Sequence, residues 1–269
     1  MDFRHYDASI GRFMVVDPMA EERNWLTPYN FVQNNPILRV DPTGLLDDYG
    51  LDQNGNIELI KETNDDTDTL YSVTRGKDGE LVKDNNGEVV KNDTNGDGQV
   101  ADGDSVTVSK NEDGTSVVSE LADSNLENKK LDSKFLFSTK TIANFGEKLK
   151  DDVFNVFKFA SDNSVREWSV VKSSVNGEVN YQLGTYHKHN YAPGFNGKGT
   201  FLGLLHSHPN QPTARDRTES LYGDLSIGAK YLRKHGKNLP YLIYFPDSGT
   251  TTKIRADKKP IRGLKNFKF

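Results

Sequence analysis

The amino-acid sequence predicts an α+β fold. The first observation is the order of patterns after residue 132, where an amphipathic helix, β-prone segments, a second helix and an apolar strand follow one another. The second observation is charge. Residues 131–269 carry 22 basic and 12 acidic residues, net +10, whereas residues 1–130 carry 12 and 27, net −15. The chain is therefore expected to contain at least two units with different surroundings.

The first helix is predicted over residues 139–163, because apolar residues recur there mostly three or four positions apart: Ile142, Phe145, Leu149, Val153, Phe154 and Phe157. β-prone segments follow at 166–172 and 178–189. Between them lies Asn176-Gly177, a dipeptide typical of a hairpin turn. This part of the chain is therefore expected to contribute a helix and two strands to the fold.

The next strand ends in a candidate metal site. Residues 201–205 form a short apolar run, and His206 and His208 follow directly. Side chains two apart on an extended chain point the same way, so the two imidazoles are expected on one face. A helix is predicted at 224–236 with Asp224 as its N-cap, followed by an apolar strand at 239–245.

Two imidazoles and one carboxylate are a set of ligands typical of catalytic zinc, with the fourth position open to water. Asp224 is the preferred carboxylate and Asp216 is the alternative. The chain has no cysteine, which excludes a thiolate zinc site and disulfide bonds.

His206, Ser207, His208 and Pro209, with Ser220 and Asp224 further on, resemble the HxHP…SxxD signature of the JAB/MPN (JAMM) metallopeptidases. The spacer here is longer than in the family, and the second element reads SxxxD. Asp224 is preferred because it is expected to open a helix, as the aspartate of the family does. The resemblance implies a mixed sheet with flanking helices and a zinc ion held by His206, His208 and Asp224.

The family also uses a glutamate on an earlier strand as general base. Glu167, at the start of segment 166–172, is the candidate, and Glu178 and Glu147 are the alternatives. The resemblance further implies that Ser220 donates a hydrogen bond to the oxyanion. A second His-x-His pair, His187 and His189, is interpreted as surface of an edge strand, with a role near the active site as the alternative.

Residues 1–45 resemble the carboxyl end of the RHS-repeat core, through the elements Y-D-x-x-x-G-R-F, Y-N-F-V-x-N-N-P and D-P-x-G-L. The resemblance implies a larger β-shell that encloses a toxin carried downstream. In related proteins paired aspartates cut the chain after the leucine, which corresponds here to Asp17, Asp41 and a break after Leu45. The first element reads DPMA here, which argues against self-cleavage by this fragment.

Residues 46–131 are expected to form an acidic linker of irregular hairpins, with turns at Asn54-Gly55, Asp78-Gly79, Asn86-Gly87 and Asp113-Gly114. One piece fits a calcium loop, with candidate ligands Asp93, Asn95, Asp97 and Asp104. The alternative is a plain turn cluster. Residues 132–269 are then the toxin domain.

Two classes of function follow. The first is a zinc peptidase or isopeptidase at the tip of an RHS-type toxin, acting on a protein substrate in a target cell and countered by a cognate immunity protein. The second is a nuclease toxin on the same carrier, although the basic residues are scattered and nucleic acid is not the expected partner. A catalytically inactive JAB-like binding module is a third alternative. The sequence shows no membrane span and no signal peptide, so we expect an effector made in the cytoplasm and delivered by another route.

Overall fold

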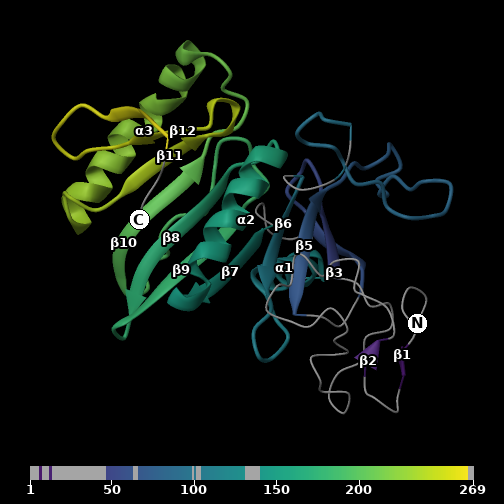
Figure 1. Ribbon diagram of the computed structural model, residues 1–269. Coiled ribbons are helices and arrows are strands. Elements are labelled where there is room, and N and C mark those ends of the chain that lie inside the picture. Colours follow the sequence, from purple (N-terminus) through teal and green to yellow (C-terminus); the bar gives the residue numbers. More distant parts are fainter. Residues whose placement is uncertain are drawn as a thin grey trace.

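The structure is a computed structural model that describes residues 6–7, 12–13, 47–62, 66–98, 100, 104–130 and 140–265. Its largest element is a seven-stranded sheet in the order β13-β12-β11-β10-β8-β9-β7 (Figure 1). Its strands are Thr141–Gly146 (β7), Trp168–Val175 (β8), Glu178–Thr185 (β9), Thr200–Ser207 (β10), Tyr241–Phe245 (β11), Thr250–Lys253 (β12) and Ile261–Leu264 (β13). Strands β10 and β11 are parallel and the other neighbours are antiparallel. With its helices, this mixed sheet confirms the predicted α+β class.

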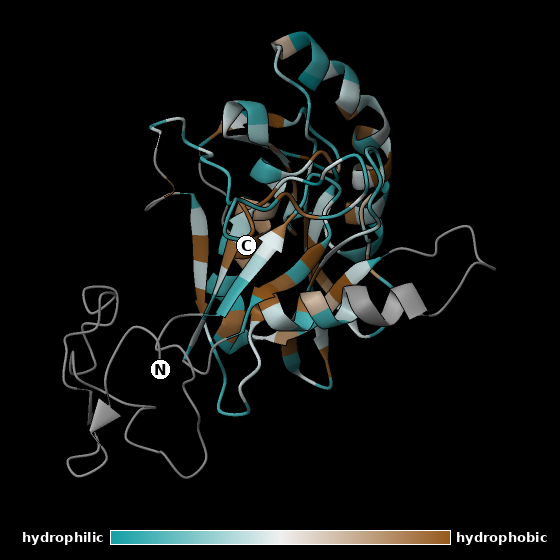
Figure 2. Ribbon diagram, turned by 90° about the vertical axis from the view of Figure 1, so that its right-hand side faces the viewer, coloured by the Kyte–Doolittle hydropathy of each residue, from teal (hydrophilic) through white to brown (hydrophobic). Residues whose placement is uncertain are grey.

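Helices cover both faces of the sheet. Helix α2 (Lys150–Asn163) contributes Val153, Val156 and Phe157 to one hydrophobic cluster, and helix α3 (Ala214–His235) contributes Leu221 and Leu232 to a second. The strands alternate between the two clusters, since Leu205 packs with α2 and Leu204 packs with α3. Figure 2 shows apolar segments on the strands that these helices cover. The core therefore has two layers, one on each side of the sheet.

Helix α3 is the connection between the parallel strands β10 and β11. Two parallel neighbours cannot be joined by a tight turn, so the chain must cross one face of the sheet between them. Gly228 permits close packing at this crossing, because a Cβ atom there would lie 3.0 Å from side-chain atoms of Tyr241 and Ile254. The helix is thereby held over the end of β10 that carries the two histidines.

The helix predicted over 139–163 is only partly correct. Residues 141–146 form β7, Glu147–Leu149 is a short 3-10 helix (η3), and α2 begins at Lys150. Thr141, Ala143 and Phe145 are buried in alternation while β7 pairs with β9. Pairing with β9 therefore decided the conformation, and the spacing of the apolar residues could not reveal it.

The start of the second helix is also wrong in the sequence prediction. Helix α3 begins at Ala214, ten residues before Asp224. Thr213 is its N-cap, and the Thr213 hydroxyl and the Asp216 carboxylate exchange hydrogen bonds with each other's backbone N–H. This capping box satisfies donors of the first turn. Asp224 is therefore not an N-cap but lies inside the helix.

Residues 47–130 are more ordered than the predicted linker. They form a mixed sheet in the order β4-β3-β5-β6 and a helix, with bounds Asp47–Leu51 (β3), Ile57–Lys61 (β4), Thr67–Ser72 (β5), Ser105–Ser109 (β6) and Val117–Lys130 (α1). Leu51, Leu70 and Val117 share the hydrophobic cluster that contains Phe145 and Phe157. The glycines of the predicted turns have φ between 81° and 87°, which confirms those turns. The four-stranded sheet and α1 thus pack against the seven-stranded sheet.

Most of the predictions for residues 1–45 fall on residues outside the described part of the chain. Of residues 1–45, only the short strands Tyr6–Asp7 (β1) and Arg12–Phe13 (β2) are described. Asp17, Asp41 and Leu45, the candidates for cleavage, lie outside the described residues. Among the helices in the described part of the chain, none is long and apolar enough to span a membrane. The short 3-10 helix Pro246–Ser248 (η4) follows β11.

Candidate metal centre

The two histidines lie at the end of β10, on the face that α3 covers. His206 pairs with Ser169 of β8 and Ile243 of β11, so it stands in the middle of the sheet. Both imidazoles are buried, with exposed fractions of 6% and 7%. Each ring meets an aromatic ring of β11 edge to face, His206 against Tyr241 and His208 against Phe245. These contacts fix the direction in which the two rings point.

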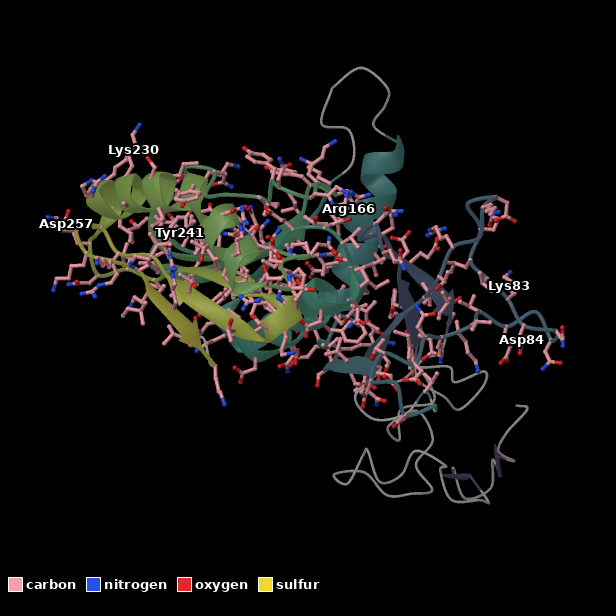
Figure 3. The ribbon with its side chains drawn as sticks, turned by 90° about the horizontal axis from the view of Figure 1, so that it is seen from above. Lys83, Asp84, Arg166, Lys230, Tyr241 and Asp257 are labelled. Carbon is pink, nitrogen blue, oxygen red and sulfur yellow. The ribbon has the colours of Figure 1, made fainter. Side chains whose placement is uncertain are left out.

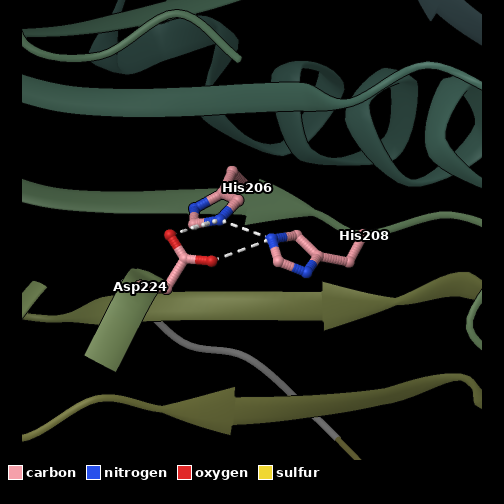
Figure 4. A group of neighbouring side chains, drawn as sticks. All are labelled: His206, His208 and Asp224. Atoms are coloured by element: carbon pink, nitrogen blue, oxygen red, sulfur yellow. Dashed lines mark hydrogen bonds and ion pairs between the residues drawn. The ribbon is translucent and has the colours of Figure 1, made fainter. Parts of the chain in front are cut away.

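Asp224 completes a group of three ligand atoms (Figure 4). The Nε2 atoms of His206 and His208 lie 3.1 Å apart, and Oδ1 and Oδ2 of Asp224 lie 3.4 Å and 3.0 Å from them respectively. Ligand atoms about 2.0–2.1 Å from a tetrahedral zinc ion are about 3.3 Å from one another. The observed separations therefore fit a zinc-sized ion, and imidazole nitrogens favour zinc and related transition metals over magnesium or calcium.

The charges of the group suit a metal ligand set. Burial opposes ionisation of Asp224, but hydrogen bonds with His206 and His208 outweigh it and hold the pKa of this carboxyl below its usual range. Burial lowers the pKa of His208. An ionised aspartate and a neutral imidazole are the protonation states that bind metal ions.

Glu167 faces the same group. It precedes β8 and is buried, and its Oε1 lies 3.6 Å from Nε2 of His208. Burial, together with the negative charge of Asp224, raises the pKa of Glu167 to about 9. A divalent cation held by the three ligand atoms would lower that pKa, because an adjacent positive charge favours the carboxylate. A bound cation would therefore balance the negative charges of this group.

Ser220 and Asp224 share one face of α3, since residues four apart on a helix are neighbours. Both line the cavity that contains the histidines, and the Ser220 hydroxyl donates to the carbonyl of Arg217 at 3.2 Å. This explains the SxxxD spacing: the spacer is partly helical, and one helical turn separates the two residues. Asp216, the alternative ligand, belongs to the capping box at the start of α3 and is not in the group with the histidines.

The cavity has a volume of about 630 Å³ and lies between α3 and the loop 186–196. Tyr186 and Tyr191 stack on one wall with ring centroids 5.4 Å apart, and Ile227 and Tyr231 of α3 form the other wall. Tyr191 and Ile227 are 58% and 57% exposed. Among the described residues that line this cavity there is no lysine or arginine. The aromatic residues of this loop have no regular spacing in the sequence that would indicate a cavity wall.

His187 and His189 do not lie on an edge strand, which corrects that interpretation. Strand β9 ends at Thr185, and both histidines lie in the loop that follows. Nδ1 of His187 donates to the carbonyl of Asn54 at 2.7 Å, and its Nε2 lies 3.1 Å from the hydroxyl of Thr141. Nε2 of His189 accepts from Arg166 at 2.7 Å, and His189 also lines the cavity. The pair therefore holds the loop beside the candidate metal centre.

The candidate calcium loop brings its carboxylates together. Oxygen atoms of Asp93, Asp97 and Asp104 lie within 4.8 Å of one another. Asp93 accepts hydrogen bonds from the N–H groups of Gly96 and Gly98, and Asp104 accepts from those of Thr94 and Asn95. The Asn95 side chain accepts from the Asp97 N–H. A strand, β6, follows Asp104. Calcium binding here stays a prediction.

The segment that carries the candidate metal centre is similar to a known family of proteins. Residues 146–230, which are 85 of the 269 residues, match the family model described as JAB-like toxin 1. A JAB-like toxin domain therefore occupies this segment, and its His-His-Asp group resembles a JAMM motif. No curated protein and no solved structure matches the chain.

Proposed function

We propose that the domain is a zinc-dependent peptidase or isopeptidase that hydrolyses an amide bond. The observation that carries the proposal is the convergence of His206, His208 and Asp224, with the carboxylate of Glu167 3.6 Å from one of the imidazoles. Three metal ligands beside a buried carboxylate are the parts that metal-assisted hydrolysis requires. The match to the JAB-like toxin family supports the same reading.

In this proposal, each residue has a separate role. The two imidazoles and Asp224 hold the ion. When bound, zinc supplies Lewis acidity and lowers the pKa of water towards about 7. Glu167 accepts a proton from water as the new carbon–oxygen bond forms, and it returns that proton to the amine nitrogen when the carbon–nitrogen bond breaks. The Ser220 hydroxyl turns away from the carbonyl of Arg217 and donates its hydrogen bond to the substrate carbonyl oxygen as that oxygen gains negative charge.

The walls of the cavity favour a polypeptide substrate. Tyr186, Tyr191, Ile227 and Tyr231 suit an uncharged or apolar side chain beside the scissile amide. A nuclease needs cations to hold phosphate. The lining, as far as the structure describes it, contains no lysine or arginine but the two carboxylates of Glu167 and Asp224. The alternative of a nuclease is therefore less well supported than amide hydrolysis.

A binding module without catalysis would have no use for Glu167. A buried carboxyl group with a pKa raised to about 9 costs stability and is expected where it serves chemistry. The family match indicates a toxin that is delivered as an effector. An RHS carrier, a protein substrate in the target cell and a cognate immunity protein complete the proposal.

The proposal is tested with the zinc-loaded full chain, a degenerate peptide mixture and a peptide that carries a lysine isopeptide bond. Mass spectrometry should find new amino termini or a released lysine side chain with the native protein. Neither product should appear after chelation of the metal. Cleavage of duplex DNA with no cleavage of either peptide would overturn the proposal in favour of the nuclease.

A further inference from the structure

We infer that the turn Asp52–Asn56, between β3 and β4, positions Glu167 for catalysis. The turn belongs to the small sheet that the sequence places in a linker, yet it reaches the segment that carries the candidate base. The inference rests on the proposed function for the role of Glu167, whereas the contacts themselves do not depend on it. Asn54 is accordingly a positioning residue.

The turn is held rigid by its own hydrogen bonds. Oδ1 of Asp52 accepts from the N–H groups of Asn54 and Asn56, at 2.8 Å and 3.0 Å. Arg75 and the Asn56 side chain donate to Oδ2 of Asp52. Gly55 adopts a φ of 81°, a conformation that glycine tolerates best. The turn therefore presents its outer groups in a fixed geometry.

Three hydrogen bonds connect this turn to the active-site segments. The carbonyl of Gln53 accepts from the N–H of Val165 at 3.0 Å. The side-chain oxygen of Asn54 accepts from Arg166 at 2.5 Å, and its carbonyl accepts from Nδ1 of His187 at 2.7 Å. The turn thus holds the residues just before Glu167 and the loop after β9 at the same time.

The same loop holds the backbone of Glu167 directly. The Glu167 N–H donates to the carbonyl of Lys188 at 2.9 Å, and the Thr185 hydroxyl donates to the Glu167 carbonyl at 2.7 Å. Arg166 also donates to His189, which lines the cavity. The backbone groups of Glu167 are therefore held by the end of β9 and the loop that follows it. Asn54 connects that loop to Arg166, the residue before Glu167. Small displacements of a catalytic group lower rates steeply.

A second turn, between the isolated bridge partners Lys83 and Val89, serves as a natural comparison. Asp84 accepts from the N–H groups of Asn86 and Glu88 at 2.8 Å and 3.0 Å, so the turn Asp84–Glu88 is built like Asp52–Asn56. All its residues are exposed, and Figure 3 shows Lys83 and Asp84 far from Arg166. A Cβ atom on Gly87 would meet nothing within 4 Å, whereas one on Gly55 would meet His187, Thr185 and Trp168. Of these two turns, only Asp52–Asn56 packs against the segments around Glu167.

The functional unit is thus larger than residues 132–269. The residues that hold the segment around Glu167 in place include 52–56, which lie upstream of the predicted boundary between residues 131 and 132. A chain released by a break after Leu45 would keep this turn. A chain released near residue 131 would lose it.

The test uses the full chain with Trp25→Phe, so that Trp168 is the single fluorescent tryptophan. Trp168 is fully buried beside Glu167, and its Nε1 donates to the Ser164 hydroxyl at 2.9 Å. Asn54→Ala removes the acceptor of Arg166, Asn54→Asp keeps an acceptor, and Asn86→Ala is the matched control. The readouts are acrylamide quenching of Trp168, zinc content, and kcat and KM on a peptide that the native protein cleaves.

Asn54→Ala should raise the quenching constant of Trp168 about twofold and lower kcat about tenfold, with KM within about twofold and zinc content unchanged. Asn54→Asp should restore both values, and Asn86→Ala should change neither. The inference is overturned when Asn54→Ala behaves like Asn86→Ala. Asn54→Ser, whose shorter side chain does not reach Arg166, decides the matter when Asn54→Ala does not fold. Absence of hydrolysis by the native protein would contradict the proposed function. The quenching constants of Trp168 in the native protein and in Asn54→Ala would then test by themselves whether the turn holds this segment.

Discussion

Oδ2 of Asp224 lies 3.0 Å from Nε2 of His208, although the two residues are sixteen positions apart in the sequence. The contact joins the end of β10 to the middle of α3 across the face of the sheet. A carboxylate that is only 18% exposed is costly without a partner. The pair that builds the candidate metal centre therefore also helps to hold α3 in place.

Removal of Asp224 should weaken zinc binding far more than removal of Asp216. Loss of an outer-shell partner alone weakens metal binding about 10–100-fold, so Asp224→Ala, which removes a ligand, should weaken it at least about 100-fold. Asp216→Ala removes only one partner of the capping box at the exposed start of α3 and should leave zinc affinity unchanged. Competition with a chromogenic zinc chelator measures both affinities. Loss of zinc from Asp216→Ala with retention by Asp224→Ala would contradict the assignment of the ligand.

Glu167→Gln should keep zinc and lose hydrolysis. The amide cannot accept a proton, so the rate should fall about 10²–10⁴-fold. The matched control is Glu178→Gln, because Glu178 is exposed at the start of β9. Peptide cleavage and zinc content are measured on the same samples. Full activity in Glu167→Gln would contradict the assignment of Glu167 as the base.

Gly228→Ala and Gly223→Ala should differ in stability, although both lie inside α3. Alanine raises helix propensity by about 1 kcal/mol at either position. At Gly228 the new methyl group would lie 3.0 Å from Tyr241 and Ile254, whereas at Gly223 it meets nothing within 4 Å. Overpacking costs about 1–3 kcal/mol, so thermal unfolding should rank Gly223→Ala above the native chain and Gly228→Ala below it. The reverse ranking would show that α3 does not pack against β11 as described.

The loop of Asp93, Asp97 and Asp104 is predicted to bind calcium, because its clustered carboxylates repel one another until a cation neutralises them. Calorimetric titration of the full chain should show binding at millimolar ion. Asp97→Asn, which removes one charge at an exposed position, should weaken that binding. An absence of heat at millimolar calcium would remove the loop from the account, and the zinc site would be unaffected.

The candidate metal ligands could be found in the sequence because their signals are local. His206 and His208 stand two apart after an apolar strand, which places them on one face whatever the rest of the chain does. Asp224 was preferred for a reason that is wrong, since it lies inside α3 and is not an N-cap. The four-residue signature Thr213 to Asp216 marks the true start of the helix and was available in the sequence.

Other features depend on contacts that leave no local pattern. Residues 141–146 become a strand because they pair with β9, and no spacing of apolar residues encodes that partner. The role of Asn54 depends on a hydrogen bond to Arg166 across 112 positions. An Asn-Gly dipeptide predicts a turn at several places in this chain, and only the three-dimensional structure shows which of these turns reaches the active site.

The zinc content of the full-length chain tests the central claim most directly. The protein is saturated with zinc and dialysed against metal-free buffer, and its zinc content is measured by inductively coupled plasma mass spectrometry. The native chain should retain close to one zinc ion per molecule. The double variant His206→Ala/His208→Ala, checked by circular dichroism to be folded, should retain almost none. Equal zinc in both proteins, or no zinc in the native chain, would contradict the account.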